Sequence, residues 1–366
     1  MANDNLDRNK ILIPNGLGKL KTLEFVRDKI SEFSGSNKPQ GGVGNFSSKI
    51  GYAISLCFKE KEIFVFVLLQ WASIGIAYLL WVQMLDWIPE EIWRTAAESD
   101  EGSIVDVILL VWSFVCVGIA AFPVGILTGC MGATHFLHKQ KRESTIAMCL
   151  KLVMPRAWPL WIFHWIDGWV TVKQIFERIP PDERKNKILS ETLYYAWKLG
   201  IAGILPSILT GASFRKSARN SIFFVKDNFL EIAKLRAGYS ALCWIVGIAA
   251  YIGSAWFLFA FDILPEGGED ELYRHMYTIY LWLGVPILVA LSIVMLILRP
   301  IYVLAICDLF SEYLSSRNEK VSLPANPQTF SSALVAFGTL CLLVIVVIIF
   351  RDELGVTAML STPVNL

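Results

Sequence analysis

The chain has 366 residues, of which 55% are hydrophobic and 18% are charged, and its mean hydropathy is +0.52. A soluble domain holds about 45–50% apolar and about 25% charged residues, so this composition excludes an ordinary soluble protein and predicts a membrane protein. The net charge of +1 gives no electrostatic basis for binding nucleic acid, and we expect none as a partner.

The chain begins with a polar segment, residues 1–62, that lacks the apolar core of a signal peptide, so the first span is expected to insert as an uncleaved anchor. Residues 17–33 place apolar side chains along one side with Lys and Arg beside them. This pattern predicts an amphipathic helix that lies on lipid headgroups, on a partner or on the rest of the protein. The "GGVG" stretch at 41–44 predicts a flexible linker. Residues 1–45 are therefore expected to form a cytoplasmic N-terminal segment.

Five uncharged apolar runs follow, and each is at least as long as the roughly 20 residues that a helix needs to cross a bilayer. The runs predict an all-α, polytopic transmembrane bundle over residues 46–350, with a short tail at 351–366. They are residues 63–85, 107–134, 237–261, 276–298 and 330–350.

The distribution of Lys and Arg among the connecting segments predicts the topology, because short cytoplasmic segments are rich in these residues. Residues 1–62 carry ten of them, 135–156 carry five and 211–236 carry six. Residues 86–106 and 262–275 carry one each, beside seven and five acidic residues respectively. The first three segments are therefore expected in the cytoplasm and the last two outside, with the protein in the inner membrane of a bacterium.

Two weaker stretches, 155–176 and 188–211, lie between cytoplasmic flanks and so cross the membrane twice or not at all. Two crossings give about seven helices, arranged as three hairpins plus a C-terminal helix, with the N-terminus in the cytoplasm and the C-terminus outside. This topology requires an outer loop at 177–187 with four Lys or Arg residues, against the expected bias. The alternative is an interfacial or re-entrant hairpin.

The stretch 155–176 is amphipathic at the helical period of about 3.6 residues. Its four tryptophans fall on one stripe, whereas Arg156, His164 and Asp167 lie on the opposite side. We expect lipid to face the tryptophans, and protein or water to face the polar side. A helix lying flat in the headgroup layer is the alternative.

The stretch 188–211 has a matching polar face, formed at helical spacing by Glu191, the two tyrosines that follow it and Lys198. In an antiparallel hairpin Asp167 and Lys198 lie at nearly equal depth, which predicts an intramembrane ion pair with His164 and Glu191 beside it. Charge is costly inside a membrane, so such a pair either serves function or fixes the register of the hairpin. The predicted polar cluster consists of Arg156, His164, Asp167, Glu191 and Lys198.

Two regions, 46–138 and 213–314, share a pattern of an amphipathic stretch, a span, an outer loop and a returning span. The stretches "SKIGYAISLCFKEKEIFVFVLLQ", "WKLGIAGILPSILTGASFRKSARNSIFFVKDNF" and "IYVLAICDLFSEYL" resemble an uncharacterised group of bacterial six-span integral membrane proteins. That group is loosely akin to the membrane domain attached to some glycerophosphodiester phosphodiesterases. The resemblance covers residues 46–314 and implies an integral membrane role without catalytic residues to transfer. The tail after 320 and the tryptophan-rich stretch depart from it.

Few other residues form a recognisable site. His135 and His138 lie one helical turn apart, but a metal site needs a third or fourth ligand and the nearest cysteine lies on a different helix, so no metal is expected. The seven cysteines form no CxxC pair and are expected to pack as small apolar residues. Arg299 precedes Pro300, which kinks or ends a helix, and is expected to contact headgroup phosphates or, alternatively, to pair with Asp308.

These observations predict a non-enzymatic integral membrane protein without a cofactor, which acts as a subunit or scaffold that binds a protein partner or lipid. The expected partners are the lipid bilayer and either another membrane protein or further copies of this chain. The first alternative is a transporter or channel with a polar path along residues 155–211. The second is a lipid-modifying enzyme, for which His135, His138 and Arg142 are the only cluster at the inner surface.

Overall fold

The computed structural model describes residues 43–85, 87, 104–176, 194–260, 280–317, 330–351 and 353–355. These residues are mostly helical and contain no strand, which confirms the all-α architecture. The chain divides into two compact units between Gly44 and Asn45, and the helices belong to the second unit apart from the first two residues of α2. The amphipathic helix expected over 17–33 and the outer loop expected at 177–187 lie outside the described residues.

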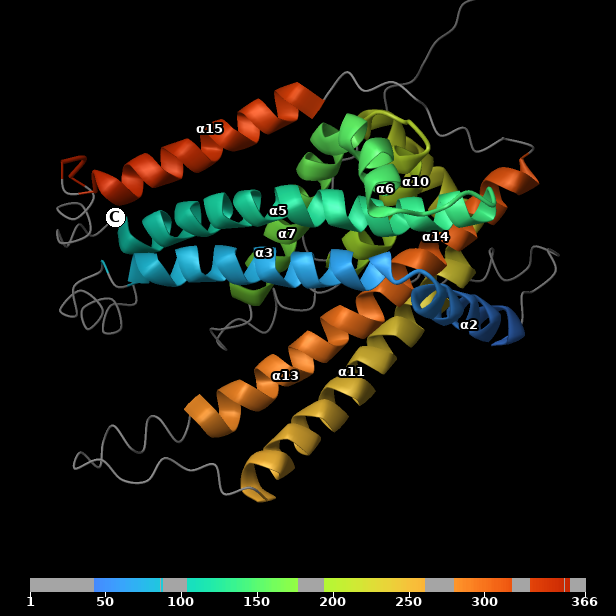
Figure 1. Cartoon of the computed structure of the whole chain (residues 1–366), viewed down its shortest axis with the longest axis horizontal. Helices are drawn as coiled ribbons and strands as arrows, with labels where there is room; N and C mark the ends of the chain where they lie inside the picture. The colour runs from blue at the N-terminus through green and yellow to red at the C-terminus, as the bar shows by residue number, and fades with distance from the viewer. Residues whose placement is uncertain are drawn as a thin grey trace, which may run out of the picture. The chain divides into compact units, whose positions relative to one another are not determined.

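The helices are coloured along the chain in Figure 1. In chain order they are α2 Val43–Lys59, α3 Glu62–Leu85, α5 Ile104–Lys139, α6 Ile146–Val153, η1 Met154–Arg156, α7 Ala157–Phe176, α9 Ile204–Leu209, α10 Phe214–Asp227, α11 Phe229–Ala260, η2 Tyr280–Gly284, α13 Val285–Ile293, η3 Val294–Leu298, α14 Arg299–Ser316 and α15 Phe330–Ile349. α2 thus begins inside the stretch that was expected to be a linker.

Six helical stretches of the described chain are long and apolar enough to cross a membrane, so the protein is an integral membrane protein. Five of them correspond to the five uncharged runs. The sixth, Ile146–Gln174, contains the tryptophan-rich stretch but begins at Ile146 instead of at 155. Pro155 lies at the start of the 3₁₀ turn η1. A proline is tolerated there because the first residues of a turn donate no N–H hydrogen bond within it.

The stretch 188–211, expected as one membrane helix, is interrupted in its described part. Residues 194–200 are helical, residues 201–203 form a turn, and α9 begins at Ile204. Every residue from Ile201 to the end of α9 is buried. A break of this kind leaves backbone polar groups without helical partners, and in an apolar interior they need partners from elsewhere in the protein.

A serine on α10 supplies those partners. The hydroxyl of Ser221 accepts a hydrogen bond from the backbone N–H of Gly203 at 2.9 Å and donates one to the carbonyl of Gly200 at 2.6 Å. A Cβ on Gly203 would lie 2.8 Å from the ring of Phe224 and 3.0 Å from Cα of Ser221, so the close approach of α10 requires a glycine here. The break at residues 201–203 is therefore stabilised by the packing of α10 against it.

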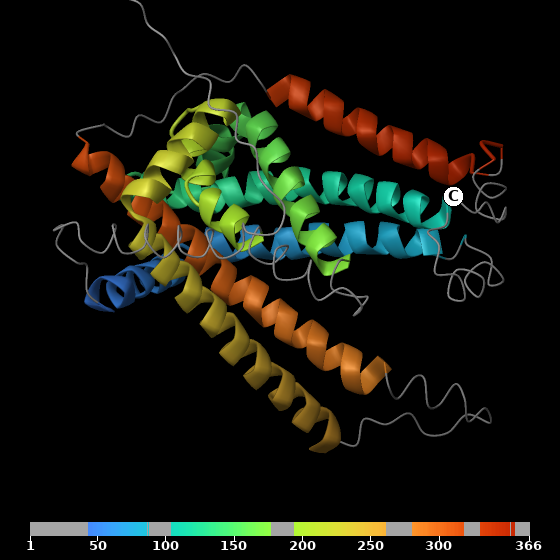
Figure 2. The same cartoon turned by 180° about the vertical axis from the view of Figure 1, so that it is seen from behind.

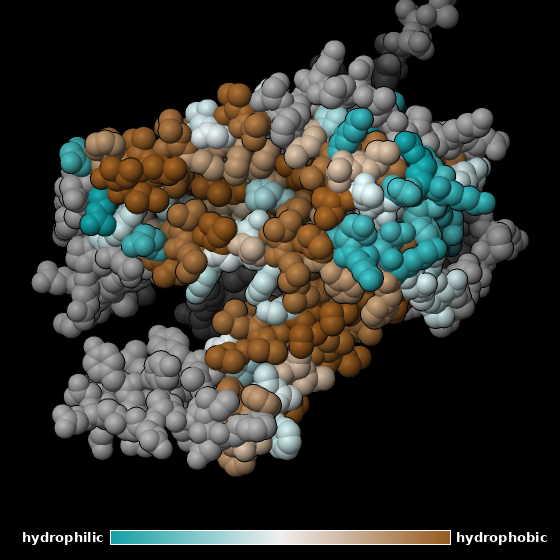
Figure 3. All heavy atoms as spheres, viewed as in Figure 1, coloured by the Kyte–Doolittle hydropathy of each residue, from teal (hydrophilic) through white to brown (hydrophobic). Residues whose placement is uncertain are grey.

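Helix α5 is at the centre of this packing. It runs antiparallel beside α3, and α7 packs against it, as Figures 1 and 2 show from opposite sides. The main core lies where α5, α9, α10 and α14 meet, and a Cβ on Gly132 of α5 would lie 2.5 Å from Leu209 of α9. Figure 3 shows apolar residues over the long helices and polar residues gathered toward the C-terminal end of α5.

α11 and α13 form a second antiparallel pair, which diverges from α3 and α5 (Figures 1 and 2). Its outer side is uncovered: Trp244, Trp256 and Phe259 are 70%, 68% and 72% exposed, as expected for side chains that face lipid. Two π-helical turns, η2 and η3, precede Pro286 and Pro300 in this region. A proline interferes with the carbonyl four residues earlier, and a π turn accommodates it without ending the helix.

Candidate functional site

Three of the four tryptophans of α7 pack against α5, so the expectation that they face lipid is wrong for Trp161, Trp165 and Trp169, whereas Trp158 is 41% exposed. Trp161 is 4% exposed, and its indole N–H donates to the carbonyl of Gly118 at 2.8 Å. The indole N–H of Trp165 donates to the carbonyl of Phe114 at 3.0 Å, and Trp169 packs edge-on against the same phenylalanine. A Cβ on Gly118 would lie 2.6 Å from the ring of Trp165. Small residues on α5 therefore let α7 approach closely.

The polar side of α7 meets the broken segment. Nζ of Lys198 lies 2.5 Å from Oδ1 of Asp167, and the indole N–H of Trp197 donates to the same oxygen at 3.2 Å. The two charged side chains are 11% and 25% exposed, and Nζ of Lys198 also lies 5.6 Å from the centroid of the Tyr194 ring. The contact expected between these two charges is present, although one of the two segments is not a continuous helix.

Two arginines, one on α11 and one at the start of α14, interact electrostatically with this ion pair. Arg299 of α14 interacts electrostatically with Asp167 and Lys198, and Arg236 of α11 interacts with Lys198. The guanidinium of Arg236 lies 5.7 Å from the centroid of the Tyr302 ring, which supports it by a cation–π contact. We call this group the Asp167 cluster; it consists of Asp167, Lys198, Arg236 and Arg299.

The Asp167 cluster sets one carboxylate against three cations among the described residues. Glu191, which was expected beside the pair, lies outside them. An uncompensated charge away from water is unfavourable, so this arrangement favours the binding of an anion. Arg236 directly precedes the uncharged run 237–261 and Arg299 directly follows the run 276–298, so both guanidinium groups lie where the apolar part of their helices ends. Since the helix continues through Pro300, Arg299 does not mark a helix end.

Arg156 and His164 form no hydrogen bond to Asp167. Arg156 is 6% exposed, and its Nη1 donates to the carbonyl of Leu152, while Nε and Nη2 have no partner within the described ranges. Nδ1 of His164 donates to the carbonyl of Leu160 at 2.9 Å, and the ring interacts with Asp167 only at longer range. Of the predicted polar cluster, the structure brings together Asp167 and Lys198, with His164 nearby and Arg156 apart.

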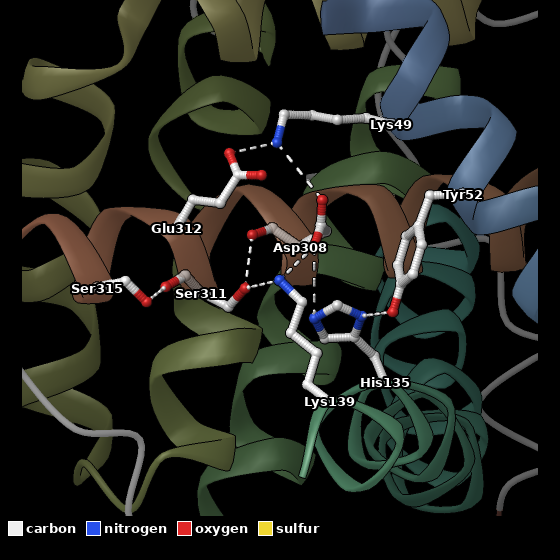
Figure 4. Close-up of polar contacts among 8 residues, drawn as sticks. All are labelled: Lys49, Tyr52, His135, Lys139, Asp308, Ser311, Glu312 and Ser315. Carbon is white, nitrogen blue, oxygen red and sulfur yellow. Dashed lines mark hydrogen bonds and ion pairs between the residues drawn. The ribbon is translucent and has the colours of Figure 1, made fainter. Parts of the chain in front are cut away.

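A second polar cluster, the Asp308 clamp, joins α2, α5 and α14 (Figure 4). Nζ of Lys139 lies 2.6 Å from Oδ1 of Asp308, and Nζ of Lys49 lies 3.4 Å from Oδ2. Lys49 also lies 2.5 Å from Glu312. Two carboxylates balance two lysines, so the clamp has no excess charge and acts as a structural joint. The alternative pairing of Asp308 with Arg299 is wrong, because a separation of nine positions (308 − 299 = 9) places the two about 13 Å apart along α14.

His135 and His138 have separate partners. The Tyr52 hydroxyl lies 3.2 Å from Nδ1 of His135, whose Nε2 lies 3.9 Å from Asp308 (Figure 4). Burial, followed by the charge of Asp308, raises the pKa of Tyr52 to about 12, so the phenol keeps its proton and donates it to Nδ1. Nδ1 of His138 lies 2.9 Å from Glu60. No group of three metal-binding side chains occurs in the part of the chain that the structure describes.

The sequence pattern did not identify Arg236 or Lys49 as site residues, for two different reasons. Arg236 stands just outside an apolar run, as Arg299 does, so a comparison of the two run ends could have identified it. Lys49 is 259 residues from Asp308, and no spacing in the sequence connects them. No family model, curated protein or solved structure matches the chain. The resemblance to the bacterial six-span group therefore stays a prediction. What bears on function is the geometry of the two polar clusters.

Proposed function

We propose that the protein is a non-enzymatic integral membrane protein that binds an anionic membrane lipid at the Asp167 cluster. The charge balance carries the proposal: Asp167 and Lys198 form a neutral ion pair, and Arg236 and Arg299, which interact electrostatically with it, add two positive charges in the described part of the cluster. A phosphate group supplies the missing negative charge. Arginine suits this role because its guanidinium offers paired N–H donors that match phosphate oxygens.

The position of the two arginines favours a lipid over a soluble anion. Arg236 and Arg299 are half-buried and flank apolar runs, and lipid phosphates lie just outside the hydrocarbon layer. Tyr239 and Tyr302, whose ring centroids are 4.6 Å apart, add the aromatic side chains that are enriched at this level of a membrane. The exposed apolar side of α11, including Trp244, provides a surface along which an acyl chain can lie.

The lipids that copurify with the protein test this proposal. We expect the wild type, purified from native membranes in mild detergent, to carry an anionic phospholipid in mass spectra of the complex. The double variant Arg236→Gln/Arg299→Gln is expected to lose at least about nine-tenths of it, since each charged contact to phosphate contributes about 1.5–3 kcal/mol. Lys234→Gln is the matched control, an exposed base on the same helix. Equal lipid in the double variant, or none on the wild type, would overturn the proposal.

The proposed location is the inner membrane of a bacterium, with residues 1–62, 135–156 and 211–236 in the cytoplasm and the C-terminus outside. The Lys and Arg bias of these segments supports this orientation. The broken segment that ends at Leu209 then provides the seventh crossing. Single cysteines placed in residues 140–145, between two candidate spans, and in residues 262–275 of a cysteine-free variant test this: a membrane-impermeant thiol reagent should label only the latter in intact cells.

We further propose that the protein acts as a subunit or scaffold, through another membrane protein or further copies of itself. The observation in favour is that the six candidate spans leave no long described segment outside the membrane that could fold as a separate catalytic domain. Mass spectrometry of proteins that copurify at constant stoichiometry, together with the mass of the detergent-solubilised particle, tests it. A monomer without a partner protein would contradict it.

Transport of an anion is the second candidate function, and the break at residues 201–203 favours it. Transporters commonly bind their substrates at interrupted helices, and the helical part that precedes this break carries Lys198. If the Asp167 cluster lines a path, Asp167→Asn and Lys198→Met abolish uptake of inorganic phosphate or chloride into proteoliposomes while the purified protein stays folded. If the pair only fixes the packing, each single variant loses yield and the double neutral variant restores it.

A further inference from the structure

A pocket of about 470 Å³ lies between α10 and α14, apart from both polar clusters. Lys216, Asn220 and Phe223 line it from α10 at i, i+4 and i+7, the spacing of one helical face. α14 contributes a second face of the same kind, and the turn after α9 forms the remaining wall. These further lining residues are Thr210, Gly211, Ala212, Phe310, Tyr313, Leu314 and Arg317.

The turn gives the pocket a fixed shape. Gly211 has φ of 96°, a conformation that residues with a side chain rarely adopt. Asn220 is held from behind, because its Nδ2 donates to the hydroxyl of Ser207 at 3.0 Å. The Asn220 side chain is therefore held in place at the wall of the pocket.

The lining contains two cations and no carboxylate. Arg317 is oriented from two sides: its Nη2 lies 2.7 Å from Oδ2 of Asp227, and its guanidinium lies 4.8 Å from the centroid of the Tyr313 ring. Only one of its nitrogens takes part in that ion pair, so other N–H donors are available to a ligand. Lys216 is exposed and forms no ion pair within the described ranges. The pocket thus offers an oriented guanidinium and a mobile ammonium group.

We propose that this pocket binds a phosphate ester, with the phosphate between Lys216 and Arg317 and the organic part against the rings of Phe223 and Phe310. Lys216 has no ion-pair partner within the described ranges and Arg317 shares its charge with Asp227, so the lining keeps a positive charge that favours an anion, and the guanidinium suits phosphate oxygens. The volume lies within the range of about 300–1,000 Å³ that is typical of small-molecule sites and exceeds what inorganic phosphate fills. The aromatic walls favour a ligand with an organic group on the phosphate.

The same chemistry is found in a lipid headgroup and in a soluble phosphate ester. α10 carries four bases and one acid, with Ile222 and Phe223 64% and 42% exposed, as in a helix at a membrane surface. Both sources can therefore reach the pocket. This site shares no residue with the Asp167 cluster, so the proposal for the pocket does not depend on the function proposed above.

Binding to the full-length protein in detergent tests the proposal with two probes. Glycerol phosphate, followed by calorimetry, represents a soluble ester; phosphatidylglycerol, followed by native mass spectrometry, represents a headgroup. We expect Lys216→Gln to weaken binding about tenfold or more, because it removes a charged contact to phosphate. Arg215→Gln, which removes the neighbouring exposed base outside the pocket, is the matched control and should leave binding unchanged.

The pattern of binding shows whether the pocket is a binding site and whether its ligand is a soluble ester or a lipid headgroup. Lys216-dependent binding of glycerol phosphate supports the pocket with a soluble ligand, and Lys216-dependent binding of phosphatidylglycerol alone supports it with a lipid. Binding must also survive in Arg236→Gln/Arg299→Gln, which separates this site from the Asp167 cluster. If neither probe binds, or if Lys216→Gln and Arg215→Gln behave alike, the proposal is wrong.

Discussion

The hydroxyl of Ser221 bridges the break after residue 200, accepting from the N–H of Gly203 at 2.9 Å and donating to the carbonyl of Gly200 at 2.6 Å. One side chain of α10 thus satisfies backbone groups on both sides of a turn that no water reaches easily. Ser221→Ala leaves both groups unpaired, and we expect the free energy of unfolding to fall by about 1–3 kcal/mol.

The thermal midpoint of the purified protein in detergent measures this effect. Ser292→Ala is the matched control, because its exposed hydroxyl bonds only to the carbonyl of Leu288 in its own helix. A midpoint of Ser221→Ala equal to that of the control would show that the serine does not hold the break.

Gly203→Ala tests the same break by its packing. The new methyl group would lie 2.8 Å from the Phe224 ring, and relief of that contact is expected to destabilise the fold by about 1–3 kcal/mol. At Gly200, three residues earlier, nothing lies within 4 Å of a new methyl group, so Gly200→Ala should be neutral or slightly stabilising. The two variants are compared by thermal midpoint and by the yield of monodisperse protein; equal behaviour would contradict the close approach of α10.

The Asp167–Lys198 pair is expected to respond unequally to the loss of its two charges. Asp167→Asn removes the one carboxylate among the described residues of the Asp167 cluster, which also holds three cations, and should cost about 3 kcal/mol. Lys198→Met leaves Asp167 with Arg299 nearby and should cost less. Thermal midpoints of both variants and of the double variant give the coupling energy. Equal losses would show that Arg299 does not compensate the charge of Asp167 when Lys198 is removed.

Asp308→Asn is expected to loosen the joint between α2, α5 and α14. The carboxylate is 9% exposed and pairs with Lys139 at 2.6 Å and with Lys49 at 3.4 Å. Its removal leaves the two lysines without their shared acceptor and should lower the free energy of unfolding by about 3 kcal/mol. Glu312→Gln is the control: its carboxylate is 57% exposed, and a surface ion pair contributes about 0–1 kcal/mol. Limited proteolysis near residue 49 together with the thermal midpoint distinguishes the two variants, and similar profiles would contradict a structural clamp.

The membrane helices could be predicted from the sequence because an uncharged run of sufficient length has few alternatives to a span. The Asp167–Lys198 contact could be predicted as well, since counting residues from a turn fixes depth even where one of the two segments is interrupted. The break itself has only a weak local signal, "LGIAGILP", because glycine and proline also occur inside membrane helices. What forces it is Ser221, eighteen residues further along the chain.

The orientation of the tryptophans could not be predicted from α7 alone. Amphipathicity shows that two faces differ, but it does not tell which one meets protein. The deciding information lies in α5, where a Cβ on Gly118 would lie within about 3 Å of Trp165, and a Cβ on Gly125 or Gly129 would lie at about the same distance from Leu160. The spacing of those glycines marks a helix face that accepts large side chains, and the bulky residues of α7 are its complement.

The bridge from Ser221 to the break also has a consequence for biogenesis. The segment that ends with α9 leaves the ribosome before α10 does, and until Ser221 has been synthesised the backbone groups of Gly200 and Gly203 lack the hydroxyl that pairs them in the folded protein. The broken segment therefore reaches its final buried conformation only after α10 has docked against it. An uninterrupted helix such as α3 satisfies its own backbone groups and has no such dependence on a later segment.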